Sequence, residues 1–204
     1  DLGRIGMDIS PINPDILFAV VEAADDKGGF FRSDDRGQSW EKMSEYNSSG
    51  NYYQEIFCDP IDINRIYAMD TWLQVSDDGG KNFKMLGEKF KHVDNHAMRI
   101  NPENNLLYLG GCDGGLYESF DGGNEWSYFA NVPIIQFYKV SVDNDFPFYN
   151  VYGGTQDNFS MGGPSRTTNI AGIPNSDWYI TNGGDGFESV VDPENPDIVY
   201  AQSQ

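Results

Sequence analysis

The stretch Ser33-Asp-Asp-Arg-Gly-Gln-Ser-Trp40 recurs twice along this chain of 204 residues. The other two copies are Ser76-Asp-Asp-Gly-Gly-Lys-Asn-Phe83 and Ser119-Phe-Asp-Gly-Gly-Asn-Glu-Trp126. All three share the form Ser-x-Asp-x-Gly-x-x-aromatic, and successive serines lie 43 residues apart. Because four positions agree three times at a constant period, the sequence indicates a structural repeat. We call each copy of this pattern a box.

A second recurring element precedes the boxes. It joins a polar residue to proline at Ser10-Pro11, Asp59-Pro60, Asn101-Pro102 and Asp192-Pro193, and it returns in weaker form at Asp143-Asn144. A short run of β-forming residues follows each copy, at 16–21, 65–69, 106–109, 148–152 and 198–201. Short apolar runs bounded by turn residues predict strands. Five units are therefore begun: three carry a box, the fourth lacks one, and the fifth breaks off at residue 204.

The first unit shows how many strands a unit holds. They are expected at Ile5–Ile9, Ile16–Val21, Phe30–Arg32 and about Trp40–Met43. A period in the low forties with four strands per unit is typical of a propeller blade. We therefore predict an all-β fold: a β-propeller of four-stranded antiparallel blades, about four and a half of them, with an incomplete ring. The predicted blades span about 4–46, 50–88, 92–132, 134–170 and 178–204.

An incomplete ring leaves an open strand edge at its last unit. Such an edge presents unpaired backbone groups that favour pairing with another strand. We therefore expect the remaining blades to come from missing chain or from another subunit. The sequence also begins at Asp1 without a starting Met, so we expect a processed or truncated chain.

The residue types of the box suit a turn between the third and fourth strands of a blade. Its aspartate can accept backbone N–H groups of its own turn. Its glycine permits positive φ, and its aromatic ring is expected to be buried at the start of the fourth strand. We assign this structural role, rather than catalysis or metal binding, to Ser33, Asp35, Gly37, Trp40, Ser76, Asp78, Gly80, Phe83, Ser119, Asp121, Gly123 and Trp126.

The box resembles the bacterial-neuraminidase or Asp-box repeat of sialidases, sortilin-type receptors, xyloglucan-degrading hydrolases and photosystem assembly factors. Three further runs resemble large secreted bacterial proteins described as sortilin-like or "glycosyl hydrolase" repeat proteins. They are Asp94-Asn-His96, Gly114-Gly115 followed by Ser119-Phe-Asp-Gly-Gly123, and Gly154-Thr-Gln-Asp-Asn158. The resemblance implies a secreted or cell-surface protein of a bacterium. It identifies architecture better than activity, because one fold hosts many functions.

The charge of the chain limits its partners. The formal net charge is −19, which repels phosphate backbones and anionic membranes, so we expect no nucleic-acid binding. No apolar stretch is long enough to span a bilayer, so membrane insertion is not expected. No cofactor is expected, although acidic turns are compatible with a structural Ca²⁺.

Strand alternation places the boxes at one end of each blade and another set of loops at the opposite end, which we call the rim. Carboxylates, amides and aromatic rings on one rim suit a glycan or peptide ligand. The predicted ligand-binding residues are Tyr53, Trp72, Asp94, Asn95, His96, Gln136, Gln156, Asp157 and Asn158. The alternative interpretation is that these residues only form polar turns.

Enzymatic activity is the second interpretation of the rim. A sialidase needs a converging arginine triad, and Arg4-Ile5 is followed by Gly6 instead of the expected proline, so sialidase activity is not expected. Xyloglucanases are built from two facing propellers, and each propeller contributes one catalytic carboxylate. Their Asp-Gly-Gly loop resembles Asp113-Gly-Gly115, which makes Asp113 the first catalytic candidate, followed by Asp70 and Asp185. The second propeller is absent from this sequence.

The histidines and cysteines bear on a transition-metal site and on a disulfide. His92, Asp94 and His96 alternate, so they share one face if the segment is extended, but no fourth ligand is apparent and no metal site is predicted. Cys58 and Cys112 are expected at opposite ends of strands about 17 Å long. Since bridged Cα atoms lie within about 7 Å, we predict no disulfide between them.

Overall fold

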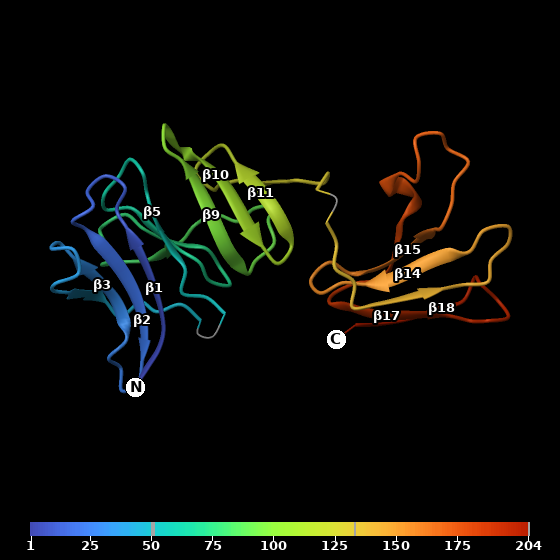
Figure 1. Ribbon diagram of the computed structural model, residues 1–204, viewed down its shortest axis with the longest axis horizontal. Coiled ribbons are helices and arrows are strands. Elements are labelled where there is room, and N and C mark those ends of the chain that lie inside the picture. The colour runs from blue at the N-terminus through green and yellow to red at the C-terminus, as the bar shows by residue number, and fades with distance from the viewer. Residues whose placement is uncertain (50–51, 133, 204) are drawn as a thin grey trace. The chain divides into compact units, whose positions relative to one another are not determined.

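The computed structural model describes residues 1–49, 52–132 and 134–203, and it is built from β-strands (Figure 1). Within these ranges, four four-stranded antiparallel sheets and one two-stranded sheet follow one another along the chain. In every four-stranded sheet, strands adjacent in sequence are adjacent in space. The prediction of an incomplete β-propeller with about four and a half blades is confirmed. The predicted start of the second blade at residue 50 and the end of the fifth at residue 204 lie outside the described residues.

The strands of the first blade lie close to their predicted positions. They are β1 (Leu2–Ile9), β2 (Leu17–Ala23), β3 (Gly29–Ser33) and β4 (Glu41–Ser44). The second blade contains β5 (Ile56–Cys58), β6 (Ile66–Ala68), β7 (Gln74–Ser76) and β8 (Lys84–Met85). The third contains β9 (Asn95–Asn101), β10 (Asn104–Cys112), β11 (Gly115–Ser119) and β12 (Ser127–Tyr128). Cys58 and Cys112 close β5 and β10, and both are free thiols.

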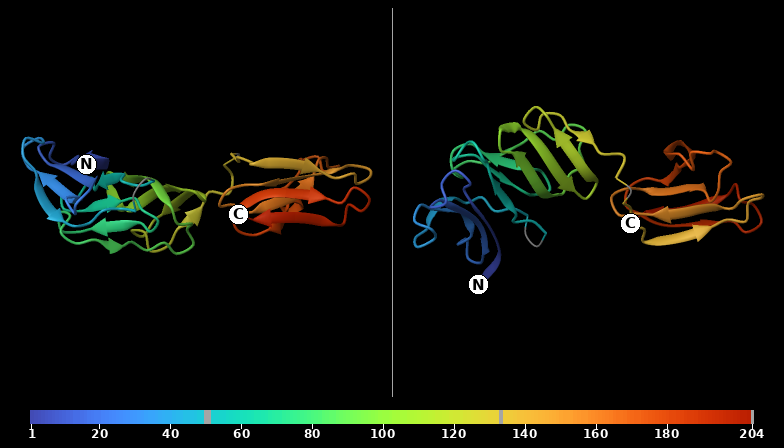
Figure 2. Two further views of the ribbon diagram at one scale, coloured as in Figure 1. Left: turned by 90° about the horizontal axis from the view of Figure 1, so that it is seen from below. Right: turned by 45° about the horizontal axis from the view of Figure 1, so that its top comes forward.

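The chain divides into two compact units, Asp1–Asn131 and Val132–Gln204, and each is described by itself. In the first unit the three blades follow one another in chain order, coloured blue, teal and green in Figure 2. Phe18 and Phe30 of the first blade pack with Ile56 and Ile66 of the second. A second core joins residues 67, 69, 73 and 75 of the second blade to residues 98, 100, 108, 117 and 126 of the third. The apolar cores of this unit therefore lie between blades.

The second unit contains the fourth blade and a two-stranded sheet. Its strands are β13 (Lys139–Val142), β14 (Asn150–Gly154), β15 (Ser160–Pro164), β16 (Tyr179–Asn182), β17 (Gly186–Val191) and β18 (Val199–Ser203). β16 pairs with β15 and is the outer strand of the fourth blade, whereas the sequence assigned residues from 178 onward to a fifth. The reason is that residues 165–178, with the short 3₁₀ helix η1 (Asn175–Asp177), occupy the place of a box. Without a box, the start of the fourth strand carries no sequence signal.

Each box closes its turn with its own side chains. The Ser33 hydroxyl donates to Asp35 Oδ1 over 2.8 Å, and Asp35 accepts the Ser39 N–H over 2.8 Å and the Ser39 hydroxyl over 2.6 Å. Asp78 accepts the corresponding N–H of Asn82 and also its side-chain amide. The bonds from Ser39 lower the pKa of Asp35 to about 2, and those from Asn82 lower the pKa of Asp78 to about 2. The box carboxylates therefore stay ionised and serve the turn.

The predicted burial of the box aromatic ring is wrong for Trp40. This ring is 39% exposed, whereas Trp126 is 3% exposed and Phe83 is half-buried. The box ring packs on the preceding blade: Phe83 stacks on Tyr46 of the first blade with ring centroids 3.9 Å apart. Within the described ranges, no blade precedes the one that carries Trp40. Its ring is therefore left partly in solvent.

The second recurring element forms a clamp that sequence reasoning did not foresee. Asp59 is fully buried and accepts the N–H groups of Ile61 and Asp62 and the Tyr67 hydroxyl over 2.8 Å. It also accepts both bonds that the Asn105 amide donates from the third blade. This turn therefore ties two neighbouring blades together at the box end.

In the part of the chain that is described, no helix is long and apolar enough to cross a membrane.

Candidate functional site

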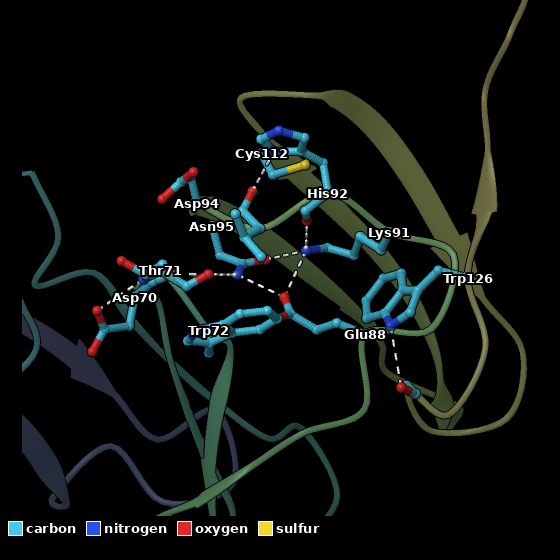
Figure 3. A network of polar contacts seen from close by, with 12 residues as sticks. Asp70, Thr71, Trp72, Glu88, Lys91, His92, Asp94, Asn95, Cys112 and Trp126 are labelled. Carbon is cyan, nitrogen blue, oxygen red and sulfur yellow. Dashed lines mark hydrogen bonds and ion pairs between the residues drawn. The ribbon is translucent and has the colours of Figure 1, made fainter. Parts of the chain in front are cut away.

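Three loops of the first unit meet at its rim. The Asp94 N–H donates to the Thr71 carbonyl over 2.9 Å, and the Asn95 N–H donates to the Asp70 carbonyl over 3.0 Å. The Asp113 N–H donates in turn to the Asp94 carbonyl over 3.2 Å. The loop between β6 and β7, the loop before β9 and the loop between β10 and β11 are thus joined by backbone bonds. Figure 3 shows the first two of these loops, with Asp70 and Thr71 beside Asp94 and Asn95. This arrangement gives the rim a fixed backbone.

Four of the predicted site residues contact one another there, and we call Tyr53, Asp94, His96 and Asp113 the rim cluster. The Tyr53 hydroxyl donates to Asp94 Oδ1 over 2.5 Å. His96 Nε2 lies 2.8 Å from Asp113 Oδ1. The rings of Tyr53 and His96 stack with centroids 5.4 Å apart, and carboxylate oxygens of Asp94 and Asp113 lie within 4.8 Å of each other. Residues up to 60 positions apart therefore form one polar patch.

The protonation of this patch follows from its packing. Burial of the phenol, its hydrogen bond to Asp94 and the nearby charge of Asp113 raise the pKa of Tyr53 to about 12. Tyr53 is therefore a neutral hydrogen-bond donor at neutral pH, and it orients the Asp94 carboxylate. His96 and Asp113 keep part of their side chains in solvent. Their side chains are 41% and 33% exposed, so both are accessible at the surface of the first unit.

The other predicted residues of this unit have different surroundings. Asp70 Oδ1 accepts the Thr71 N–H over 2.8 Å and the Ser49 N–H over 3.3 Å, so this candidate acid is used in a turn. Trp72 is exposed and lies in the loop that holds Asp94. Asn95 is buried, and its amide donates to the Asp70 and Thr71 carbonyls. Its position suits support of the rim better than contact with a ligand.

The predicted residues of the second unit form a group of their own. The Asp157 N–H donates to Asp185 Oδ1 over 3.0 Å, and the Asn158 amide donates to the Gln156 carbonyl over 3.4 Å. Gln156 Oε1 also accepts the Tyr138 hydroxyl. Gln136 is exposed on the segment before β13. Asp185 thus holds the loop between β14 and β15.

The alternation proposed for His92, Asp94 and His96 is wrong. β9 begins at Asn95, and Asp94 has a φ of +63°, which turns the chain instead of extending it. His92 Nδ1 lies 2.9 Å from the Val93 carbonyl oxygen, while His96 is paired with Asp113. In the described part of the chain, these three side chains are not a group that could hold a metal ion.

Sequence reasoning missed two charged residues beneath the rim. Lys91 and Glu88 form an ion pair in the loop between β8 and β9, and both side chains are buried. Charged residues in a loop normally indicate solvent exposure, so composition gave no signal for this pair. Figure 3 shows Lys91 pointing toward Glu88 and Asn95.

Comparison with known proteins agrees with this architecture. The BNR/Asp-box repeat model matches residues 31–42. The chain is 31% identical over 151 residues to the xyloglucanase Xgh74A of Acetivibrio thermocellus, a match covering 59% of this chain and 18% of that protein. Its fold is similar to that of the GH74 enzyme of Niastella koreensis, with a TM-score of 0.52 and 13% identity over 98% of this chain and 33% of that one. The GH74 xyloglucanase of Xanthomonas campestris gives a TM-score of 0.46 at 15% identity, covering 96% and 34%.

These matches confirm the Asp-box propeller and its more distant resemblance to xyloglucanases. They also show that the chain spans less than a fifth of the curated relative that it matches.

Proposed function

We propose that the rim cluster binds a neutral glycan, as part of a larger secreted or cell-surface propeller protein. The observation that carries this proposal is the cluster itself: a stacked Tyr53–His96 pair and two carboxylates on one rim. Carboxylates accept hydrogen bonds from sugar hydroxyls, an imidazole can accept or donate them, and the exposed Trp72 in the adjoining loop offers a ring face for stacking.

The choice of glycan follows from charge and from the relative. A net charge of −19 disfavours a polyanionic ligand. The curated relative is a xyloglucanase, and xyloglucan is therefore the first glycan to test. The competing ligand class is a peptide, as in sortilin-like proteins. Peptide binding does not require an aromatic ring face next to two carboxylates.

Calorimetric titration with a xyloglucan oligosaccharide tests the proposal. We expect H96A and D113N each to weaken binding at least about tenfold, which is about 1.4 kcal/mol. E103Q is the matched control, because Glu103 is an exposed acid in the turn between β9 and β10, at the box end. Its affinity should stay within about twofold. Absence of binding by the unaltered chain, or unchanged affinity of D113N, would overturn the proposal, and binding of a peptide library alone would replace the glycan by a peptide.

Glycoside hydrolysis is the second candidate function, and the place of Asp113 favours it. Asp113 is partly exposed and precedes Gly114-Gly115, as in the loop that resembles xyloglucanases. An inverting pair needs carboxyls about 6.5–9.5 Å apart. Oxygens of Asp94 and Asp113 within 4.8 Å are too close for such a pair. The partner carboxylate of Asp113 would have to come from a second propeller, and loss of reducing-sugar release in D113N of the full-length protein is the expected result.

Further blades are part of the same proposal. Ile5, Met7 and Ile9 alternate along β1 and are exposed, as is Trp40 of the same blade. The positions that match Met7 and Ile9 are buried in the cores between blades, at Ile56 and Cys58 in the second blade and at Met98 and Ile100 in the third. We infer that another blade, from a longer polypeptide or another subunit, covers this face of the first blade.

A further inference from the structure

A buried ion pair lies in the loop between β8 and β9, the same loop that carries Asp94 of the rim cluster. Lys91 Nζ is 2.9 Å from Glu88 Oε1, and the two side chains are 0% and 4% exposed. Lys91 also donates to the His92 carbonyl over 2.8 Å and to Asn95 Oδ1. All three ammonium donors are therefore used, and the ammonium lies 5.5 Å from the centre of the Trp126 ring.

Asn95 connects this pair to the neighbouring loop. Its amide donates to Glu88 Oε1 over 2.8 Å, to the Asp70 carbonyl over 3.1 Å and to the Thr71 carbonyl over 3.4 Å (Figure 3). The network thus fastens the loop before β9 to the loop between β6 and β7. Asp94 lies inside the fastened segment.

Stability alone does not account for this network. A buried ion pair is often no more stabilising than apolar residues of the same volume. Glu88 Oε2 is buried and has no hydrogen-bond partner among the described residues, which is a further cost. The corresponding loop between the first two blades contains no lysine, and Tyr53 stands there at the repeat position of Asn95. The network is therefore a departure from the repeat, and it occurs where the rim cluster is built.

We propose that Glu88, Lys91 and Asn95 are positioning residues for the rim cluster. They hold the loop so that Asp94 keeps its left-handed backbone, with a φ of +63°. In that conformation the Asp94 carboxylate accepts the Tyr53 hydroxyl, and the Asp94 carbonyl accepts the Asp113 N–H. When a ligand binds a loop that is already ordered, less of the binding free energy is lost to ordering that loop. The role in ligand binding rests on the proposed function, whereas the role in holding the loop does not.

The test removes the buried charges together. K91M alone leaves Glu88 buried without its partner and can unfold the blade, so E88Q/K91M is the informative variant. Met has a length and volume close to those of Lys, and Gln keeps an acceptor for the Asn95 amide. K89M/E125Q is the matched control, because Lys89 and Glu125 form an exposed ion pair in the same region of the second and third blades.

Amide hydrogen exchange measures the positioning directly. We expect E88Q/K91M to lose protection at least about tenfold at Asp94, Asn95 and Asp113, while the amides of β2 and β3 keep theirs. The control variant should match the unaltered chain at all these positions. Unchanged protection at the three amides, or an equal loss throughout the first unit, would overturn the proposal.

Glycan titration separates this proposal from the proposed function. In E88Q/K91M the affinity for the xyloglucan oligosaccharide should fall at least about tenfold, with none of its rim-cluster residues altered. If the unaltered chain binds no glycan, the proposed function fails. Hydrogen exchange still tests whether the network orders the loop. Full affinity in a variant whose loop has lost protection would show that the network does not serve ligand binding.

Discussion

Trp40 and Trp126 occupy the same position in the repeat but have opposite surroundings. Both indole N–H groups donate to the box glycine carbonyl, over 3.2 Å at Gly37 and 3.1 Å at Gly123. Trp126 also donates to the Gly87 carbonyl of the preceding blade over 2.9 Å. Its ring is covered by that blade, while the ring of Trp40 is exposed. A box therefore builds its own turn, but only a neighbouring blade buries its ring.

The inner strands repeat this contrast. Met7 in β1 and Met98 in β9 stand at equivalent positions, three residues before the polar residue that opens the next turn. Met7 is 60% exposed and Met98 is 6% exposed. Because the difference appears on two strands of the same face, it reflects the lack of a covering blade among the described residues and not a property of tryptophan. The face of the first blade that carries Met7 and Trp40 is apolar, and the described residues do not cover it.

The largest expected difference is between W126A and W40A. Removing a buried tryptophan costs about 3–5 kcal/mol, because apolar contacts are lost and a cavity remains. W40A removes a ring that has no blade above it, so we expect a cost of about 1 kcal/mol or less. Urea unfolding of the two variants measures both values. Equal losses would mean that the ring of Trp40 is buried in solution.

The methionine pair should show the same order with smaller values. M98A is expected to lower the free energy of unfolding by about 2–4 kcal/mol, and M7A by about 0.5 kcal/mol or less. The measurement is the urea midpoint at constant slope. A loss in M7A as large as that in M98A would contradict the exposed face, and would point to self-association through it.

The box carboxylates should show no such contrast. Hydrogen bonds within the turn lower the pKa values of Asp35 and Asp78 to about 2 in both blades, although only one of the two rings is covered. Since the folded pKa lies below the unfolded value, this stabilisation is complete above about pH 4 and is lost as the pH falls toward about 2. Carbon-detected NMR titration of the two carboxyls measures the values. A difference of more than about one pKa unit would show that the turn depends on the neighbouring blade.

The features that could be predicted from the sequence are the local ones. The box turns and the strands of the first blade follow from residues close in sequence, and they were found. The exposure of Trp40 depends on whether another blade covers its own, so no pattern within its own repeat could reveal it. The fourth blade shows the same limit, since without a box the residues of its outer strand β16 were assigned to the fifth blade.

The rim shows where prediction from the sequence reached its limit. Strand alternation placed Asp94, His96 and Asp113 at one end of the blades, but not in contact. Their contacts involve the positive φ of Asp94 and backbone hydrogen bonds between loops of two blades, neither of which a local pattern reveals. Glu88 lies only three residues from Lys91, but the Trp126 ring that covers the ammonium comes from a distant segment, so the loop by itself gives no signal of burial.

We propose that the box end of the blades holds the fold and that the rim binds the ligand. NMR titration with a xyloglucan oligosaccharide tests it most directly, by mapping the amide shifts onto the first unit. We expect shifts at Tyr53, Thr71 and Trp72, Asp94 to His96, and Asp113 to Gly115, with the box turns unchanged. Shifts confined to the turns around Asp35, Asp78 and Asp121 would contradict it.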